Sequence, residues 1–167
     1  FNQMTAEQLI SYILIHHHFY VKQAMPTILG HLHKVAAKHG SAYPYMLEVY
    51  TIFSEINEDM TAHMQKEESI LFPGIKELEA GKKGNGYIST AIEAMELEHD
   101  NAGELLYKIR ELTNNYTAPA DACTTFTVSL AELKTFEEDL HKHVHLENNL
   151  LFPLAERILS GQGSLHS

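Results

Sequence analysis

The sequence predicts an all-α protein, an antiparallel up-down four-helix bundle, and three observations support this fold class. Turn-forming residues divide the 167-residue chain into four long segments. Within each segment apolar residues recur at alternating steps of three and four, which is the spacing of one face of an α-helix. No stretch shows the sustained two-residue alternation that is typical of strands. Four such helices joined by short loops would pack with their apolar stripes inward.

The first two segments meet at a short turn. The first segment is expected to end at His39, because Gly40 and Ser41 follow it. Its inward stripe consists of Leu14, His18, Val21, Met25, Ile28, Leu32 and Val35. The second segment is expected to end after Leu78, before a glycine-rich loop over residues 80–86. Its stripe consists of Met46, Val49, Phe53, Ile56, Met60, His63, Glu67 and Ile70.

The third segment is expected to end at the loop over residues 113–119, and the fourth at about Leu159. The third stripe consists of Ile88, Ile92, Met95, His99, Ala102, Leu106 and Ile109. The fourth stripe consists of Leu133, Phe136, Leu140, His143, Glu147 and Leu150. These boundaries predict one helical domain over residues 1–160, followed by a C-terminal tail over residues 161–167.

Composition narrows the classes of function. A formal net charge of -10 argues against binding to nucleic acid or to anionic membranes, because both need clustered Lys and Arg. No apolar run approaches the roughly 20 residues needed to cross a bilayer, so no membrane association is expected. The single cysteine, Cys123, fits a reducing cytoplasm and is expected to be a packed small residue rather than a reactive thiol. The unusual feature is histidine, with twelve residues.

Polar residues interrupt every apolar stripe. A lone histidine at such a position is more often a hydrogen-bonded core residue than a metal ligand. Buried His and Glu are costly unless they are hydrogen-bonded, paired or bound to a metal, and here the innocent explanation would have to hold six times. The six candidate ligands are His18, His63, Glu67, His99, His143 and Glu147.

Depth along the bundle brings the four stripe histidines to one level. Because a helix rises about 1.5 Å per residue, residues equally far from a connecting turn lie side by side in an antiparallel pair. His18 lies 23 residues before Ser41 and His63 lies 22 residues after it. The matching separations are 20 and 16 residues about Lys83, and 18 and 26 residues about Thr117. Each glutamate follows its own histidine by one turn, which predicts a metal site formed by all six residues.

The other histidines are expected to lie outside this site. His39 is 21 residues beyond His18, or about 31 Å along a continuous helix, so it could join the site only if the helix broke near Pro26. His16 and His17 are interpreted as solvated surface residues. The histidines with no partner at the site level, also interpreted as surface residues, are His31, His33, His141, His145 and His166.

An internal repeat supports the site. Residues 63–73 and 143–153 share the pattern H-x3-E-x2-[IL]-L-F-P, 80 residues apart. The H-x3-E part supplies ligands, and the final proline is expected to end or kink the helix. One copy of H-x3-E is a weak signal, whereas two copies with matching flanks, together with His18 and His99, are a strong one.

The ligand types indicate the metal. The absence of thiolates argues against structural zinc and iron–sulfur clusters, and the mixed ligands argue against calcium or magnesium. Four imidazoles and two carboxylates suit a pair of borderline transition ions such as iron, with the glutamates bridging. Manganese or a mixed pair stays open at this point.

Beyond the ligands, the chain resembles the hemerythrin-like HHE proteins, and within them the di-iron proteins that repair iron–sulfur clusters. The segments that carry the resemblance are Glu98-His99-Asp100, residues 102–106, Thr113-Asn114-Asn115, residues 122–126 and residues 146–149, besides the H-x3-E repeat. The resemblance implies a hemerythrin-like fold, two iron ions with an oxo bridge, and the same six ligands. It also places a further family histidine at His39. Members of this family usually begin with a short cysteine-bearing domain, which this sequence does not contain, and Phe1 in place of Met suggests that a segment precedes it.

Two functions follow from the resemblance. One is the repair or protection of iron–sulfur proteins damaged by nitric oxide or oxidative stress, by reaction with nitric oxide or oxygen species or by donation of iron. The alternative is binding or sensing of O2 or nitric oxide without repair. Gly103, four residues after His99, stands where respiratory hemerythrins carry a second histidine, which favours reactivity over simple carriage. The sequence does not rank iron donation against nitric oxide chemistry, and it assigns no separate catalytic residues and no oligomeric state.

Overall fold

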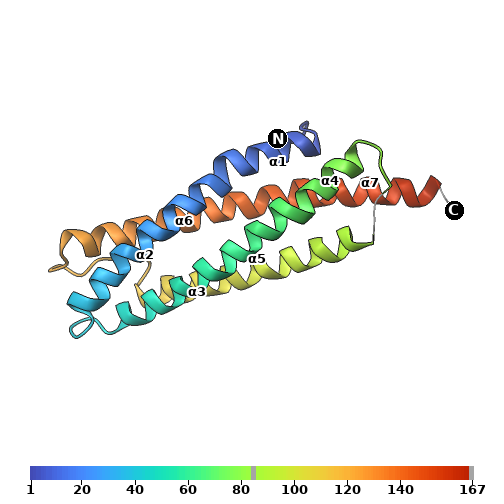
Figure 1. Ribbon diagram of the computed structural model, residues 1–167. Coiled ribbons are helices and arrows are strands. Elements are labelled where there is room, and N and C mark those ends of the chain that lie inside the picture. The colour runs from blue at the N-terminus through green and yellow to red at the C-terminus, as the bar shows by residue number, and fades with distance from the viewer. Residues whose placement is uncertain (84–85, 166–167) are drawn as a thin grey trace.

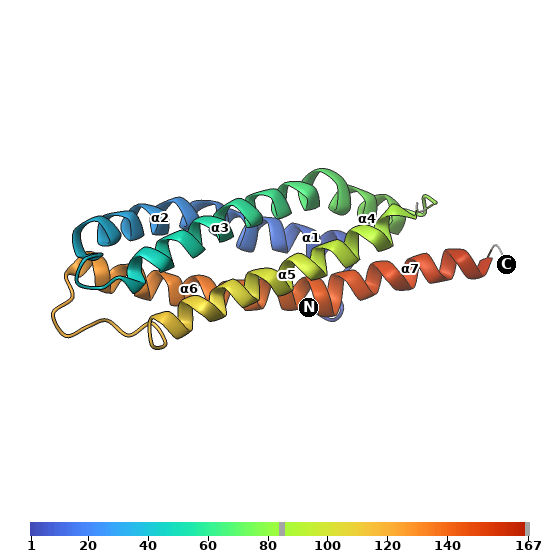
Figure 2. The same cartoon turned by 90° about the horizontal axis from the view of Figure 1, so that it is seen from below.

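A computed structural model describes residues 1–83 and 86–165 of the chain, with side chains up to residue 162. The described residues form helices and turns without strands, so the all-helical prediction is confirmed. Four long helical rods lie side by side (Figures 1 and 2). The connecting loop predicted at residues 80–86 is non-helical where it is described, and residues 84–85 within it lie outside the described residues.

Three of the four rods are interrupted by a π-helical turn. The first rod comprises α1 (Ala6–Tyr12), the π turn η1 (Ile13–His18) and α2 (Phe19–His39). The second comprises α3 (Tyr45–Lys66), η2 (Glu67–Leu71) and α4 (Phe72–Glu79). The third is α5 alone (Tyr87–Leu112). The fourth comprises α6 (Thr124–Leu146), η3 (Glu147–Leu151) and α7 (Phe152–Leu165).

The first rod is fixed at both of its ends. Thr5 accepts a hydrogen bond from the backbone N–H of Gln8, whose side chain returns one to the N–H of Thr5, which is a capping box. The carboxylate of Glu79, at the end of α4, accepts hydrogen bonds from the first two N–H groups of α1, at 2.6 and 3.0 Å. At the other end α2 stops at His39, as predicted, and it continues through Pro26 without a break.

The π turns overturn two details of the predicted helices. Ile70, which the stripe placed inward, is 52% exposed, while Leu71 is buried. A π turn holds one more residue than an α turn, so the apolar face moves on by one position beyond Glu67. The proline of the Leu-Phe-Pro sequence does not end the helix either. Pro73 is the second residue of α4, where the missing N–H leaves no hydrogen bond unmade.

The fourth rod is longer than predicted. Its helix runs through Gly161 and ends at Leu165, rather than at about Leu159. The division between a domain over residues 1–160 and a tail over residues 161–167 stays a prediction, and residues 166–167 lie outside the described residues.

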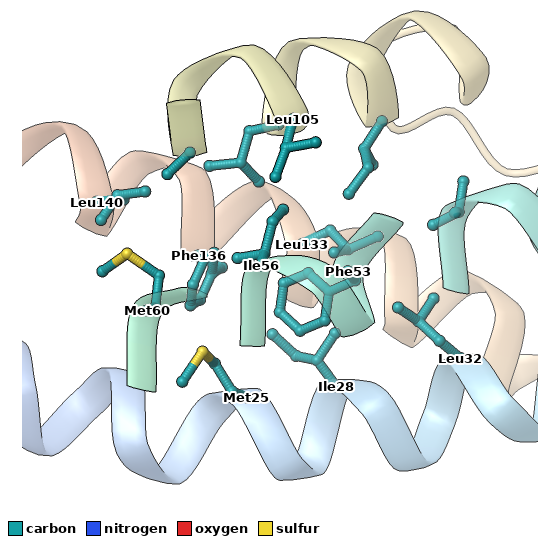
Figure 3. Close-up of a cluster of buried hydrophobic side chains, with 14 of the residues drawn as sticks. Met25, Ile28, Leu32, Phe53, Ile56, Met60, Leu105, Leu133, Phe136 and Leu140 are labelled. Carbon is teal, nitrogen blue, oxygen red and sulfur yellow. The ribbon is translucent and has the colours of Figure 1, made fainter. Parts of the chain in front are cut away.

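The apolar core is divided into two clusters along the bundle. One lies around α2, α3, α5 and α6, and Figure 3 shows part of it, including the edge-to-face pair of Phe53 and Phe136, whose ring centroids are 5.2 Å apart. The other lies around α1, α4 and α7 at the opposite end of the rods. None of the described helices is long and apolar enough to span a membrane.

The first prediction tests the larger cluster. Phe53→Ala should lower the free energy of unfolding by about 3–5 kcal/mol, because it removes a fully buried ring and leaves a cavity. Chemical denaturation monitored by circular dichroism measures this change. Leu97→Ala, at a side chain that is 70% exposed, is the control and should change the stability by less than about 0.5 kcal/mol. An equal loss in both variants would contradict the packing described here.

Candidate metal centre

A layer of buried polar residues lies between the two apolar clusters. It contains the six candidate ligands predicted from the sequence, none more than 4% exposed: His18, His63, Glu67, His99, His143 and Glu147. They come from all four rods, because η1, α3, α5 and α6 each supply a histidine. Both glutamates are the first residues of π turns, η2 and η3. The structure therefore brings together the six residues that the stripes and the depth argument selected.

Their ligand atoms form two groups that share both glutamates. In one group His18 and His143 face Glu67 and Glu147, and in the other His63 and His99 face the same two carboxylates. Within each group the ligand atoms lie within 4.8 Å of one another. Two histidines on each side and two carboxylates in common form the arrangement expected of a pair of metal ions.

Each glutamate offers one oxygen to each group. Glu67 Oε1 lies 3.1 Å from His18 Nε2, and its Oε2 lies 3.4 Å from His63 Nε2. On the opposite side Glu147 Oε1 lies 2.8 Å from His99 Nε2, and its Oε2 lies 3.4 Å from His143 Nε2. Both carboxylates therefore span the two groups, as bridging ligands do.

The outer nitrogens of three histidines are held by neighbouring side chains. The Nδ1 atoms of His18 and His63 lie 2.8 and 3.0 Å from Glu68 and Glu98, and the Nδ1 of His99 lies 2.9 Å from the Asn148 side-chain oxygen. These oxygens accept hydrogen bonds, so each Nδ1 donates its proton and each Nε2 keeps a free lone pair. Supporting partners of this kind orient metal-ligating histidines and raise their basicity.

Several inner atoms lack the partners that burial demands. Among the described residues, Glu67 Oε2, His143 Nε2 and both carboxylate oxygens of Glu147 make no hydrogen bond, although nitrogens lie near them. The Nε2 atoms of His63 and His99 lie 3.1 Å apart, with their lone pairs facing each other. Such an arrangement is repulsive by itself and favourable around cations, so the residues fit a metal site that holds more than one ion.

Charge also favours cations in this layer. Burial lowers the pKa of His18 to about 4, so its imidazole is neutral at pH 7. Burial and the charge of Glu147 raise the pKa of Glu67 well above its ordinary value. Burial acts on Glu147 in the same direction, but His143, His63 and His99 outweigh it and hold its pKa well below the ordinary range. Metal ions would favour ionisation of both carboxylates and release the proton that Glu67 retains without them.

Surface lysines keep two of the supporting carboxylates charged. Lys22 lies 2.8 Å from Glu68, and Lys66 lies 2.8 Å from Glu98. Burial alone would raise the pKa of each carboxyl, but the hydrogen bonds from the lysine and the histidine outweigh it and lower both values. Sequence reasoning assigned no role to Glu68, Glu98 or Asn148. Their positions next to a ligand in the chain, one after Glu67 and Glu147 and one before His99, were the available signal.

His17 corrects another prediction, since it is buried rather than solvated. It is 5% exposed, its Nδ1 lies 3.1 Å from Asp139, and its ring stacks on that of His143. The widened turn η1 allows His17 and His18 to be buried together. His16 is exposed, as predicted.

The remaining histidines lie away from the six. His39 is at the end of α2, packed near Phe126, and belongs to neither ligand group. His33, His141 and His145 are exposed, as expected, whereas His31 is partly buried and lies 2.6 Å from Glu132. His166 lies outside the described residues. Cys123 packs partly buried against the larger apolar cluster, in line with a structural role.

Comparison with known proteins gives the family. Residues 9–155 match the Hemerythrin HHE cation binding domain. The chain is 37% identical over 155 residues to the iron-sulfur cluster repair protein YtfE of Enterobacter sp. (strain 638), an alignment that covers 93% of this chain and 67% of that protein. It is 36% identical over the same length to the protein of that name from Escherichia coli O81 (strain ED1a), with the same coverage. The chain therefore belongs to the hemerythrin-like HHE family of cation-binding domains and, within it, to the branch of iron–sulfur cluster repair proteins.

Proposed function

We propose that this protein repairs or protects iron–sulfur and other iron centres damaged by nitric oxide or oxidative stress, through an iron pair held in the polar layer. The observation that carries the proposal is the bridging arrangement, in which each glutamate offers one oxygen to each of two histidine pairs. Relatives named as iron–sulfur cluster repair proteins, similar over 93% of this chain, support the repair function. Damaged iron–sulfur proteins are then its partners, and a reducing cytoplasm, which suits the free Cys123, is its proposed location.

The metal ligands in this proposal are the six residues of the polar layer. His18 and His143 would hold one iron, His63 and His99 the other, and Glu67 and Glu147 both. Four imidazoles with two carboxylates suit iron, and an oxo bridge would complete the pair. When bound, such a pair can bind nitric oxide or oxygen species, or serve as a source of iron for a damaged cluster.

The protein provides orientation, dryness and access. Glu68, Glu98 and Asn148 fix three imidazoles, and the two apolar clusters exclude water from both ends of the layer. A surface groove of about 870 Å³ reaches His99 and Gly103. A side-chain Cβ at Gly103 would meet nothing within 4 Å, so the space beside His99 is open to small molecules.

The fold that holds these ligands is, in this proposal, an antiparallel up-down bundle. The placement of a histidine from every rod at one level agrees with the depth argument, which assumed that arrangement. The connections between the rods in Figure 1 support it.

Metal content tests the bridges. The purified protein should hold close to two irons per chain and show an oxo-bridged charge-transfer absorption when oxidised. Glu67→Ala and Glu147→Ala should each lower the affinity for iron by about tenfold or more, because each carboxylate serves both ions. Glu132→Ala, away from the layer, is the control. One iron per chain in the wild type, or two retained in either bridge variant, would refute the bridging scheme.

His18 and His39 separate geometry from the family's habit. His18→Ala should change both the metal content and the absorption spectrum, because the imidazole faces Glu67 directly. His39→Ala should leave two irons bound, because His39 packs near Phe126 at the far end of α2. Iron analysis and visible spectroscopy of both variants measure this. Loss of iron from the His39 variant alone would overturn the assignment.

Repair itself is tested with a damaged enzyme. The iron-loaded protein, incubated with an aconitase-type enzyme whose cluster nitric oxide has degraded, should restore its activity, and labelled iron should move into the restored cluster. Glu67→Ala protein, matched for concentration, should restore little. Tight binding of nitric oxide without any restoration would support the alternative, a binding or sensing protein without repair activity.

A further inference from the structure

One ligand histidine lacks the support that the other three share. Among the described residues, His143 Nδ1 has no hydrogen-bond partner, although it is fully buried. The Nδ1 atoms of His18, His63 and His99 are all bonded to neighbouring side chains. Since such bonds set the orientation of a ligand imidazole, something else must orient His143.

A second histidine ring occupies the place of that support. His17 lies against His143 with ring centroids 5.5 Å apart and planes inclined by 19°, a stacked arrangement. On its other side lies Tyr12, with ring centroids 5.9 Å apart. His17 thus fills the space between the first rod and the ligand on α6.

His17 is itself anchored to the helix that carries the ligand. Its Nδ1 lies 3.1 Å from the carboxylate of Asp139, one turn before His143 on α6. The histidine side chain is 6% exposed and the aspartate 20%, so the contact is largely shielded from water. His17 contributes to neither group of ligand atoms, so its role is distinct from that of a ligand.

The internal repeat gives this position a meaning. Glu68 and Asn148 are equivalent positions, each following a bridging glutamate, and they support His18 and His99. Glu98 and His17 are equivalent in the same way, each preceding the lone histidine of its rod. Glu98 supports His63, the histidine of the first H-x3-E copy, and His17 contacts His143, the histidine of the second.

We propose that His17 is the positioning residue for His143, holding its imidazole by ring stacking where the other three ligand histidines are held by hydrogen bonds. The inference rests on the proposed iron pair. It singles out the ion between His18 and His143 as the one whose binding depends on a stacked ring anchored by Asp139.

The test compares His17→Ala and His17→Phe with the exposed neighbour His16→Ala, all loaded with ⁵⁷Fe. Release of iron to a ferrous chelator under reducing conditions gives the rate for each ion, and Mössbauer spectra give the environment of each. His17→Ala should release one iron about tenfold faster than wild type and shift one of the two signals, with the other unchanged. His17→Phe, which keeps a stacked ring, should restore the slow rate and the signal, and His16→Ala should match wild type.

Three results would overturn the proposal. Two unchanged signals and rates in His17→Ala would show that the ring does not position His143. Equal acceleration of both ions, with a lowered melting temperature, would assign His17 a general structural role. Failure of His17→Phe to restore the signal in a folded protein would exclude stacking as the cause. A wild-type protein without an iron pair would instead refute the proposed function, and the two failures are therefore distinguishable.

Discussion

Six ionisable or strongly polar side chains are buried at one level of an otherwise apolar bundle, and most other features of the structure compensate for that burial. Each such group, taken from water without a partner, costs several kcal/mol. Hydrogen bonds to Glu68, Glu98 and Asn148 satisfy the outward nitrogens of three imidazoles. The inward atoms have no comparable partners among the described residues, and cations are the partners that their lone pairs and charges suit.

This compensation extends to the surface. A carboxylate that supports a buried imidazole must itself stay ionised near a low-dielectric interior. Lys22 and Lys66 provide for this at Glu68 and Glu98. Two chains of charge therefore run from a surface lysine through a carboxylate and a histidine to the centre of the bundle. On α5 the amide of Asn148 replaces the carboxylate, and that support needs no lysine.

The sequence predicted the features that depend on periodicity and depth. The four rods, the level of the ligands and the exclusion of His39 all follow from spacing along regular helices, and Pro26 did not disturb them because α2 continues through it. The π turns could not be predicted, because one extra residue in a helix leaves no signal in an apolar pattern of this length. That is why Ile70 was assigned inward and His17 outward. The supporting residues were missed for a different reason, since Glu68 and Glu98 look like ordinary charged surface residues until their partners are known.

The extra residue in the π turn η2 makes the chain length critical on either side of the metal layer. The apolar faces of α3 and α4 are out of phase by one residue, and Glu67 lies where the phase changes. Deletion of one residue within 67–71 would restore a regular helix and keep the composition almost unchanged. It would also turn Leu71, Phe72 and Ile75 by roughly 100°, away from the core they now fill. Insertions and deletions at this level are therefore far less tolerable than most substitutions, and homologous chains are expected to keep the spacing between Glu67 and Phe72 even where the residues between them differ.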